Sequence, residues 1–499
     1  MIREEKRMDE EWAGEITKLF REMVNFYRME YSQPLIRLFN EFAFLLLCWL
    51  YSREEAFTES ELRKLPSAML ADIVKGLGYA QSEEKELVAL WQEHGLERYR
   101  TFIYKGAVLR PLLLAASRLA ERAAGWRQDA GLDGPRRDEW RRNLYGMLCR
   151  LLELCAGDKS EKGRYLLREQ EAGWLLRLIE EDKEEAGMIL DPQCGAAAML
   201  DAAGRQFGRM SLYGMEEDED WYRAACFLGH FSNFPISLRK ESMEEAYMRP
   251  DRPKDRYDLV IANPVFNNTP VAERGGVPLL LLPVDGIRSR YHYQIVGSLS
   301  AVRKEGKALL FVPDSFLFAS KNESVRVRKW MLDEFAVDGV ILLPESAFMG
   351  NMTVKASLLV VENPLMAGGW EDSHTQRIFF YDLRGQAERR DGKAYDALLA
   401  CWDKRQAYYE EWQELLAAGG QENYNGVRTP EKWEHTDCWF AGIEEIRKAG
   451  GTLLPDYYRP AGRQEIHFAP PEELLREMID MQERIAEEMR ALLTEVEGL

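Results

Sequence analysis

The chain has 499 residues, of which 46% are hydrophobic and 30% are charged, and its formal net charge is −18. This length predicts two to four domains, and the composition excludes a globally disordered chain. The negative net charge argues against a protein that binds DNA without a partner, because such proteins are basic on at least one face. Either the chain has a local basic surface that its net charge does not reveal, or a partner supplies most of the phosphate contacts.

No targeting or membrane segment is expected. The first residues, MIREEKRMDEEW, lack the apolar stretch of a secretory signal peptide. The longest apolar run, at residues 42–51, is about half as long as a membrane span requires. We therefore expect a cytoplasmic protein that makes no membrane contact.

The cysteines and histidines indicate neither a disulfide framework nor a metal site. The chain has seven cysteines and six histidines, and both kinds are scattered along it. No CxxC or HExxH pattern occurs. This spacing fits a reducing compartment, and we expect no protein-bound metal.

Residues 1–155 are predicted to form an N-terminal all-helical domain. Apolar residues recur at helical spacing between residues 12 and 27, and TESE at residues 58–61 is a capping-box pattern. Strand signals are almost absent. A basic cluster at residues 136–142 is either a solvated helix face or a phosphate contact.

The pattern changes to alternating strands and helices over residues 156–365. Short apolar runs at residues 188–190, 210–213, 236–238 and 259–262 predict strands. This alternation is typical of an α/β fold with a doubly wound, Rossmann-like parallel sheet. Further strands are expected at residues 308–313, 337–343 and 353–361, and we predict the last as an antiparallel edge strand.

Two further segments complete the expected organisation. Residues 366–470 form a mixed extension, with a strand at residues 377–382 and a polar helix at residues 395–416. Residues 471–499 are predicted to form one helix whose apolar positions step by three, four or seven. That spacing favours a coiled-coil seam, with either a partner helix or the chain's own surface. Between the strands, residues 269–287 are rich in Pro and Gly and are expected to be a loop.

The sequence YDLVIANPVFN at residues 257–267 holds the first candidate site. Its apolar run predicts a buried strand, and ligands of open α/β sheets lie outside the carboxyl ends of strands. Asn263 and the carbonyl of Pro264 could accept the two hydrogens of a nucleobase amine, while Phe266 stacks on the base. The alternative is a strand that ends in an Asn-Pro turn with one buried Phe.

The loop after the first predicted strand holds the second candidate site. Asp191 and Gly195 lie in this loop, and Glu216 follows the next strand. In Rossmann-like sheets such positions bind an adenosine-bearing cofactor, with the second carboxylate on the ribose hydroxyls. Residues 196–198 are all Ala where glycines are expected for close backbone approach, so this signal is weak by itself.

The two sites, in this order, resemble a known family. The modification subunits of type I restriction–modification systems are similar in six blocks: LREQEAGWLLRLI, ILDPQCGAAAML, LYGMEED, YDLVIANPVFN, ALLFVPDSFLF and VDGVILLPESAFMGNMTVKASLLVVENP. The resemblance spans roughly residues 140–365 and continues more loosely through residues 439–460 and the C-terminal helix. It implies an N6-adenine DNA methyltransferase that uses S-adenosyl-L-methionine, and it also accounts for the N-terminal helical domain.

The resemblance further implies a role for each candidate residue and a set of partners. The cofactor-binding residues would be Arg168, Asp191, Gly195 and Glu216, with Asp191 and Gly195 at the methionine end and Glu216 at the ribose. The residues that hold the flipped adenine would be Asn263, Pro264 and Phe266. The implied partners are DNA, a separate specificity subunit and a second copy of the chain through the C-terminal helix.

Three departures from the family pattern leave alternatives open. The usual DPxCGxGG turn reads DPQCGAAA, Leu166-Leu167 replaces a Thr-Pro pair before Arg168, and Val265 replaces a proline. The first two changes both affect the cofactor site. The alternatives are a catalytically inactive scaffold that has lost the cofactor, and a methyltransferase for another amine in RNA or protein.

Overall fold

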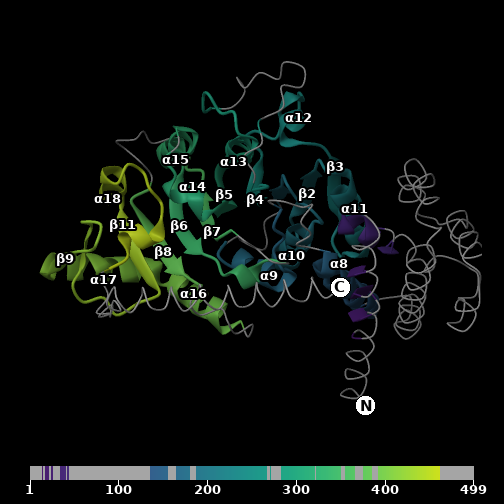
Figure 1. Cartoon of the computed structure of the whole chain (residues 1–499), viewed down its shortest axis with the longest axis horizontal. Coiled ribbons are helices and arrows are strands. Elements are labelled where there is room, and N and C mark those ends of the chain that lie inside the picture. The colour runs from purple at the N-terminus through teal and green to yellow at the C-terminus, as the bar shows by residue number, and fades with distance from the viewer. Residues whose placement is uncertain are drawn as a thin grey trace, which may run out of the picture.

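The computed structural model describes parts of residues 14–43 and residues 135–155, 164–179, 187–266, 270, 283–320, 322–349, 354–365, 375–384 and 392–460 (Figure 1). Most of the predicted helical domain at residues 1–155, most of the loop at residues 269–287 and the whole helix at residues 471–499 therefore lie outside the described residues. Within the described residues, no helix has both the length and the apolar character needed to cross a membrane.

A nine-stranded sheet runs through the described part of the chain, in the order β11-β8-β6-β7-β5-β4-β1-β2-β3. Its strands are β1 Met188–Asp191, β2 Ser211–Glu216, β3 Ile236–Lys240, β4 Tyr257–Ala262, β5 Val302–Pro313, β6 Ala336–Leu342, β7 Ala356–Glu362, β8 Arg377–Asp382 and β11 Cys438–Gly442. A small hairpin, β9 Gly420–Glu422 and β10 Arg428–Pro430, stands apart from it. The sheet confirms the predicted α/β fold.

Most neighbours in the sheet are parallel, and two strands run the other way. Strands β1, β2, β3, β4 and β5 pair in parallel, as do β6 and β8. Strand β11 is antiparallel to β8 and forms one edge. Strand β7 is also antiparallel, but it lies between β5 and β6, so the predicted edge position of residues 353–361 is wrong. The reason is that residues 356–361 are buried without interruption, as in a strand covered on both faces.

Helices connect the strands and cover the sheet. Their bounds are α8 Pro135–Cys155, α9 Glu169–Leu176, α10 Ala198–Phe207, α11 Glu219–Phe231, α12 Met243–Met248, α13 Arg290–Ser300, α14 Asp314–Phe318, α15 Asn322–Glu334, α16 Lys393–Asp403, α17 Arg405–Ala418, α18 Ile443–Lys448 and α19 Pro455–Tyr458. Helix α10 packs on α9 and β1, whereas α13 packs on α15, β4 and β5. In the strand order, β2 follows β1 toward the β3 edge, whereas β5 follows β4 toward the β11 edge. Right-handed connections therefore place α10 and α13 on opposite faces.

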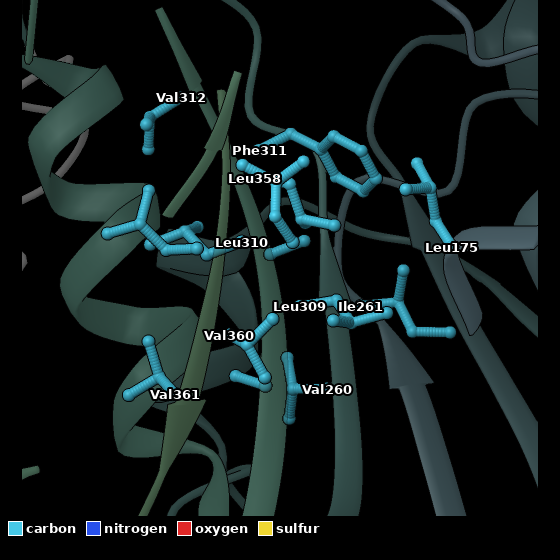
Figure 2. Packing of buried hydrophobic residues seen from close by; sticks show 14 of the residues in the cluster. Leu175, Val260, Ile261, Leu309, Leu310, Phe311, Val312, Leu358, Val360 and Val361 are labelled. Atoms are coloured by element: carbon cyan, nitrogen blue, oxygen red, sulfur yellow. The ribbon is translucent and has the colours of Figure 1, made fainter. Parts of the chain in front are cut away.

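The core lies on both faces of the central strands (Figure 2). Along β5, Leu309 and Phe311 point to one face, where Leu175 of α9 lies, and Leu310 and Val312 point to the other. All four β5 side chains are fully buried. This double burial explains why the strand reads as a continuous apolar run and not as an alternating one.

The strand order reverses between β1 and β4, which are adjacent and parallel. Such a switch point opens a crevice at the carboxyl ends of the two strands, and ligands bind there in open α/β sheets. Asp191 is the last residue of β1, and Asn263 directly follows β4. The fold therefore brings the two candidate sites of the sequence to the same edge.

Candidate functional site

Asp191 is a buried carboxyl group that receives little hydrogen bonding to offset the loss of water. Its side chain is 2% exposed and accepts a 3.2 Å hydrogen bond from the backbone N–H of Gln193. The pKa of Asp191 is raised to about 8, chiefly by burial; the hydrogen bond from Gln193 opposes this rise, and the nearby Glu216 carboxylate adds to it. A carboxyl group in this state is suited to a positively charged ligand, which would return it to the ionised form.

The turn that follows Asp191 adopts left-handed backbone conformations at two positions. Gly195 has φ 54°, and Ala197, which precedes α10, has φ 62°. An L-residue in this region costs roughly 1–2 kcal/mol, so Ala197 takes a conformation that suits glycine. A Cβ atom on Gly195 would lie 2.9 Å from Cδ2 of Leu166, which shows how closely Leu166 covers this turn.

Glu216 ends β2 and is also 2% exposed. Its carboxylate accepts two hydrogen bonds from the guanidinium of Arg164, at 2.8 and 3.0 Å. The backbone N–H groups of Gly195 and Asp218 donate two more, each at 2.9 Å. A bidentate pair between Arg and a carboxylate is among the strong hydrogen bonds of proteins, so Glu216 is firmly held.

Asn263 follows β4 and is fixed by a contact with a distant part of the chain. Its Nδ2 donates a 2.6 Å hydrogen bond to the backbone carbonyl of Tyr165. Because a carbonyl oxygen accepts and does not donate, this contact decides which way the amide faces. The acceptor atom Oδ1 therefore faces away from Tyr165. Pro264, the next residue, is buried.

Phe266 lies in a cluster of aromatic rings. Its ring centroid is 5.6 Å from that of Tyr165 and 6.1 Å from that of Tyr291, and its own side chain is half-buried. Tyr291 is a residue that the sequence analysis missed, because a Tyr in a buried helix carries no motif. Its hydroxyl is buried and has no hydrogen-bond partner among the described residues, and burial raises its pKa.

Arg168 and Arg164 have different surroundings. The Nε of Arg168 donates a 2.9 Å hydrogen bond to the backbone carbonyl of Ser346, and its guanidinium also pairs with Glu153 of α8. Arg164, four residues earlier, contacts Glu216. The role of Arg168 in cofactor binding stays a prediction, and Arg164 joins the site although no motif pointed to it.

A short upstream segment thus links four of the predicted residues, Gly195, Glu216, Asn263 and Phe266. Gly195 and Glu216 are hydrogen-bonded to each other, and Arg164 contacts Glu216. The neighbouring residue, Tyr165, contacts both Asn263 and Phe266. Among the residues that the structure describes, no group of three or more His, Cys, Asp and Glu side chains is arranged to hold a metal ion.

The cofactor that the sequence resemblance implies, S-adenosylmethionine, has two features that the site residues would have to bind. S-adenosylmethionine carries a positively charged sulfur and a ribose with two neighbouring hydroxyl groups. The buried carboxyl of Asp191 suits a cation, and Glu216 at the next strand end suits the hydroxyl pair. Arg164 fills some of the acceptor positions of Glu216. The residues of the site therefore fit S-adenosylmethionine once that guanidinium moves away.

Known structures share this fold. A solved chain from a study of complex assembly and conformational transition in the type I restriction–modification system is 16% identical, with a TM-score of 0.58 over 98% of this chain and 99% of that one. The methyltransferase subunit of a type I restriction–modification system from Streptococcus thermophilus is 14% identical, with a TM-score of 0.58 over 90% of this chain and 99% of that one. At these identities the likeness shows a common fold.

Sequence comparison gives the family. No sequence among the curated proteins matches the chain. The family model described as N-6 DNA methylase matches residues 151–465, which is more than half of the 499 residues and includes every candidate site residue. The resemblance found in the ordered sequence blocks is thereby confirmed, and the chain belongs to the N-6 DNA methylase family.

Proposed function

We propose that this chain is the modification subunit of a type I-like restriction–modification system, and that it transfers a methyl group from S-adenosylmethionine to N6 of an adenine flipped out of DNA. The observation that carries the proposal is that Tyr165 contacts both the fixed amide of Asn263, at the switch point of the sheet, and the half-buried ring of Phe266. The family of the chain supports DNA as the substrate.

The residues after β4 would act on the amine of the base. The lone pair of an exocyclic amine is delocalised into the ring, so the amine is a poor nucleophile. Oδ1 of Asn263 and the carbonyl of Pro264 would accept its two hydrogens and direct the lone pair out of the ring plane. Phe266 would stack on the extruded base, a contact worth ~1–3 kcal/mol.

The carboxylates after β1 and β2 would hold the cofactor. When bound, S-adenosylmethionine supplies a methyl group on a positively charged sulfur, which is the electrophile. Asp191 would face the cationic end and Glu216 the ribose. Because these residues sit at strand ends beside Asn263, their main contribution would be to position the two reactants.

A separate subunit would recognise the DNA sequence. The net charge of −18 supports this division, because an acidic chain is poorly suited to hold many phosphates. The partner would then supply most of the phosphate contacts, and both subunits would work in the cytoplasm.

The test is methyl transfer by the chain together with its specificity subunit. Labelled S-adenosylmethionine is supplied with DNA that contains the target site, and the DNA is digested to nucleosides. We expect label in N6-methyladenine from the native chain, and none from Asn263→Ala. The matched control is Asn425→Ala, since Asn425 also donates through Nδ2 to a backbone carbonyl but lies in the β9–β10 turn.

Other outcomes would point to the alternatives. Label in RNA or protein, with none in DNA, would indicate a methyltransferase for another amine. A complex that assembles but neither binds S-adenosylmethionine nor transfers label would indicate a scaffold subunit and would overturn the proposal.

A further inference from the structure

One short segment, residues 164–167, touches both halves of the site; we call it the strap. Arg164 pairs with Glu216, and Leu166 covers Gly195 in the cofactor turn. Between them, the carbonyl of Tyr165 holds the amide of Asn263. The strap therefore links the cofactor residues to the residues predicted to hold the base.

The strap is anchored at its C-terminal end. Leu167 forms an isolated antiparallel bridge with Phe348. The backbone N–H of Met349 donates a 2.7 Å hydrogen bond to the carbonyl of Leu166, and the backbone N–H of Arg168 donates one of 3.0 Å to Ala347. The main chain is held at these positions, so a release of Glu216 would be a movement of the Arg164 side chain.

The acceptor capacity of Glu216 shows what has to change before a ribose can bind. A carboxylate has about four acceptor positions, and Glu216 receives four hydrogen bonds. Two of them come from the backbone of Gly195 and Asp218, which belong to the turns after β1 and β2. The two from Arg164 are those that can be released without altering the main chain.

The charge of Arg164 also affects how well the site would bind a cationic cofactor. Its side chain is 12% exposed, and its guanidinium lies 5.2 Å from the ring centroid of Trp221. In this position its charge cancels that of Glu216, so the paired site attracts a cationic cofactor less than a free Glu216 carboxylate would. Attraction between opposite charges in a partly buried site is less screened than in water.

We infer that Arg164 is an internal ligand of Glu216 that competes with the ribose of the cofactor and so limits the affinity of the chain for S-adenosylmethionine. This inference rests on the proposed function. The cofactor binds to the form in which Arg164 has turned away from Glu216. The smaller the population of that form, the lower the apparent affinity for the cofactor.

The experiment is calorimetric titration of S-adenosylmethionine into the full chain and its variants. Arg164→Ala is expected to bind at least about 10-fold more tightly than the native chain, because a charge-assisted hydrogen bond no longer has to be broken. Arg164→Lys keeps the charge without the bidentate geometry and is expected to lie between the two. The matched control is Arg177→Ala, which removes an exposed arginine whose carboxylate partner, Asp396, is also exposed.

A second background tests whether Arg164 acts through Glu216. In Glu216→Gln the guanidinium has no carboxylate to compete for, so adding Arg164→Ala is expected to give less than a 2-fold gain. Melting curves of each variant report whether it is folded. An equal gain in both backgrounds would overturn the inference.

The outcomes separate the inference from the proposed function. If the native chain binds the cofactor and Arg164→Ala binds no better, the inference is wrong and the proposed function stands. If no variant binds, Arg164 is not what keeps the cofactor out, and the proposed function fails as well.

Discussion

The side-chain amide of Asn263 donates a 2.6 Å hydrogen bond to the backbone carbonyl of Tyr165, which lies 98 positions earlier in the chain. The orientation of this amide is therefore set by a tertiary contact and not by the Asn-Pro turn itself. In the proposed function, the residue at position 263 would donate to Tyr165 with one atom and accept from the base with the other. Asn meets both requirements, and its acidic counterpart does not.

Asn263→Asp is expected to abolish methyl transfer and to lower stability by about 1–3 kcal/mol near neutral pH, because a carboxylate oxygen would face the Tyr165 carbonyl without a hydrogen between them. The defect in stability should shrink as the pH falls and the carboxyl group becomes protonated and able to donate. Chemical denaturation of native chain, Asn263→Asp and Asn263→Ala at pH 5 and pH 8 measures this. A deficit of Asn263→Asp that is the same at both pH values would contradict it.

Phe266→Ala is expected to weaken binding of the extruded base by ~1–3 kcal/mol, since the stacking surface is lost. Phe266→Tyr retains the ring and should behave like the native chain. The measurement is the fluorescence of 2-aminopurine at the target position of the DNA, which rises when the base leaves the stack. An unchanged signal in Phe266→Ala would show that this ring does not hold the base.

The affinity for S-adenosylmethionine is expected to rise with pH up to about 8. Burial raises the pKa of Asp191 to about 8, so the free chain carries a proton there at neutral pH. A cation bound beside Asp191 lowers that pKa and releases the proton, so binding strengthens by up to about 10-fold per pH unit below 8. Calorimetry in two buffers of different ionisation enthalpy measures the proton. Equal enthalpies in both buffers would contradict this prediction.

Asp191→Asn is expected to stabilise the chain at alkaline pH while it weakens cofactor binding. The folded-state pKa of about 8 lies above the ordinary value of 3.8, so the contribution of Asp191 to stability is complete below pH 3.8 and is lost as the pH rises to 8. The variant does not titrate, and its advantage should grow across this window to a few kcal/mol, since a tenfold change in proton concentration corresponds to about 1.4 kcal/mol. Denaturant unfolding at pH 5, 7 and 9 measures the difference. A constant difference would show that Asp191 does not titrate there.

Ala197→Gly is expected to cost at least about 1 kcal/mol less than Ala203→Gly. Ala197 has φ 62°, where glycine relieves the strain of an L-residue, whereas Ala203 is buried within α10, where glycine is unfavourable. Thermal unfolding of the two variants provides the comparison. If Ala197→Gly proves the more damaging of the two, the turn does not have the conformation seen here.

The strands that carry the site could be predicted from the sequence. Continuous apolar runs marked β1, β4 and β5, because a strand buried on both faces must be apolar at every position. The placement of Asp191 and Asn263 at strand ends followed directly. Their proximity also followed from the expected parallel sheet, since the carboxyl ends of neighbouring parallel strands meet at one edge.

The tertiary structure decided what local patterns do not encode. The sequence suggested an edge for residues 353–361, but β7 lies between β5 and β6, because pairing order depends on contacts between distant strands. No motif pointed to Arg164, which contacts Glu216 from 52 positions away. The sequence by itself determined the family and the strands after which Asp191 and Asn263 are placed, since burial imposes a local pattern, whereas β11 at the edge of the sheet was not predicted. Which hydrogen-bonding atoms of Glu216 and Asn263 are already occupied was decided by the folded chain alone, because a hydrogen bond between distant residues leaves no periodic trace in the sequence.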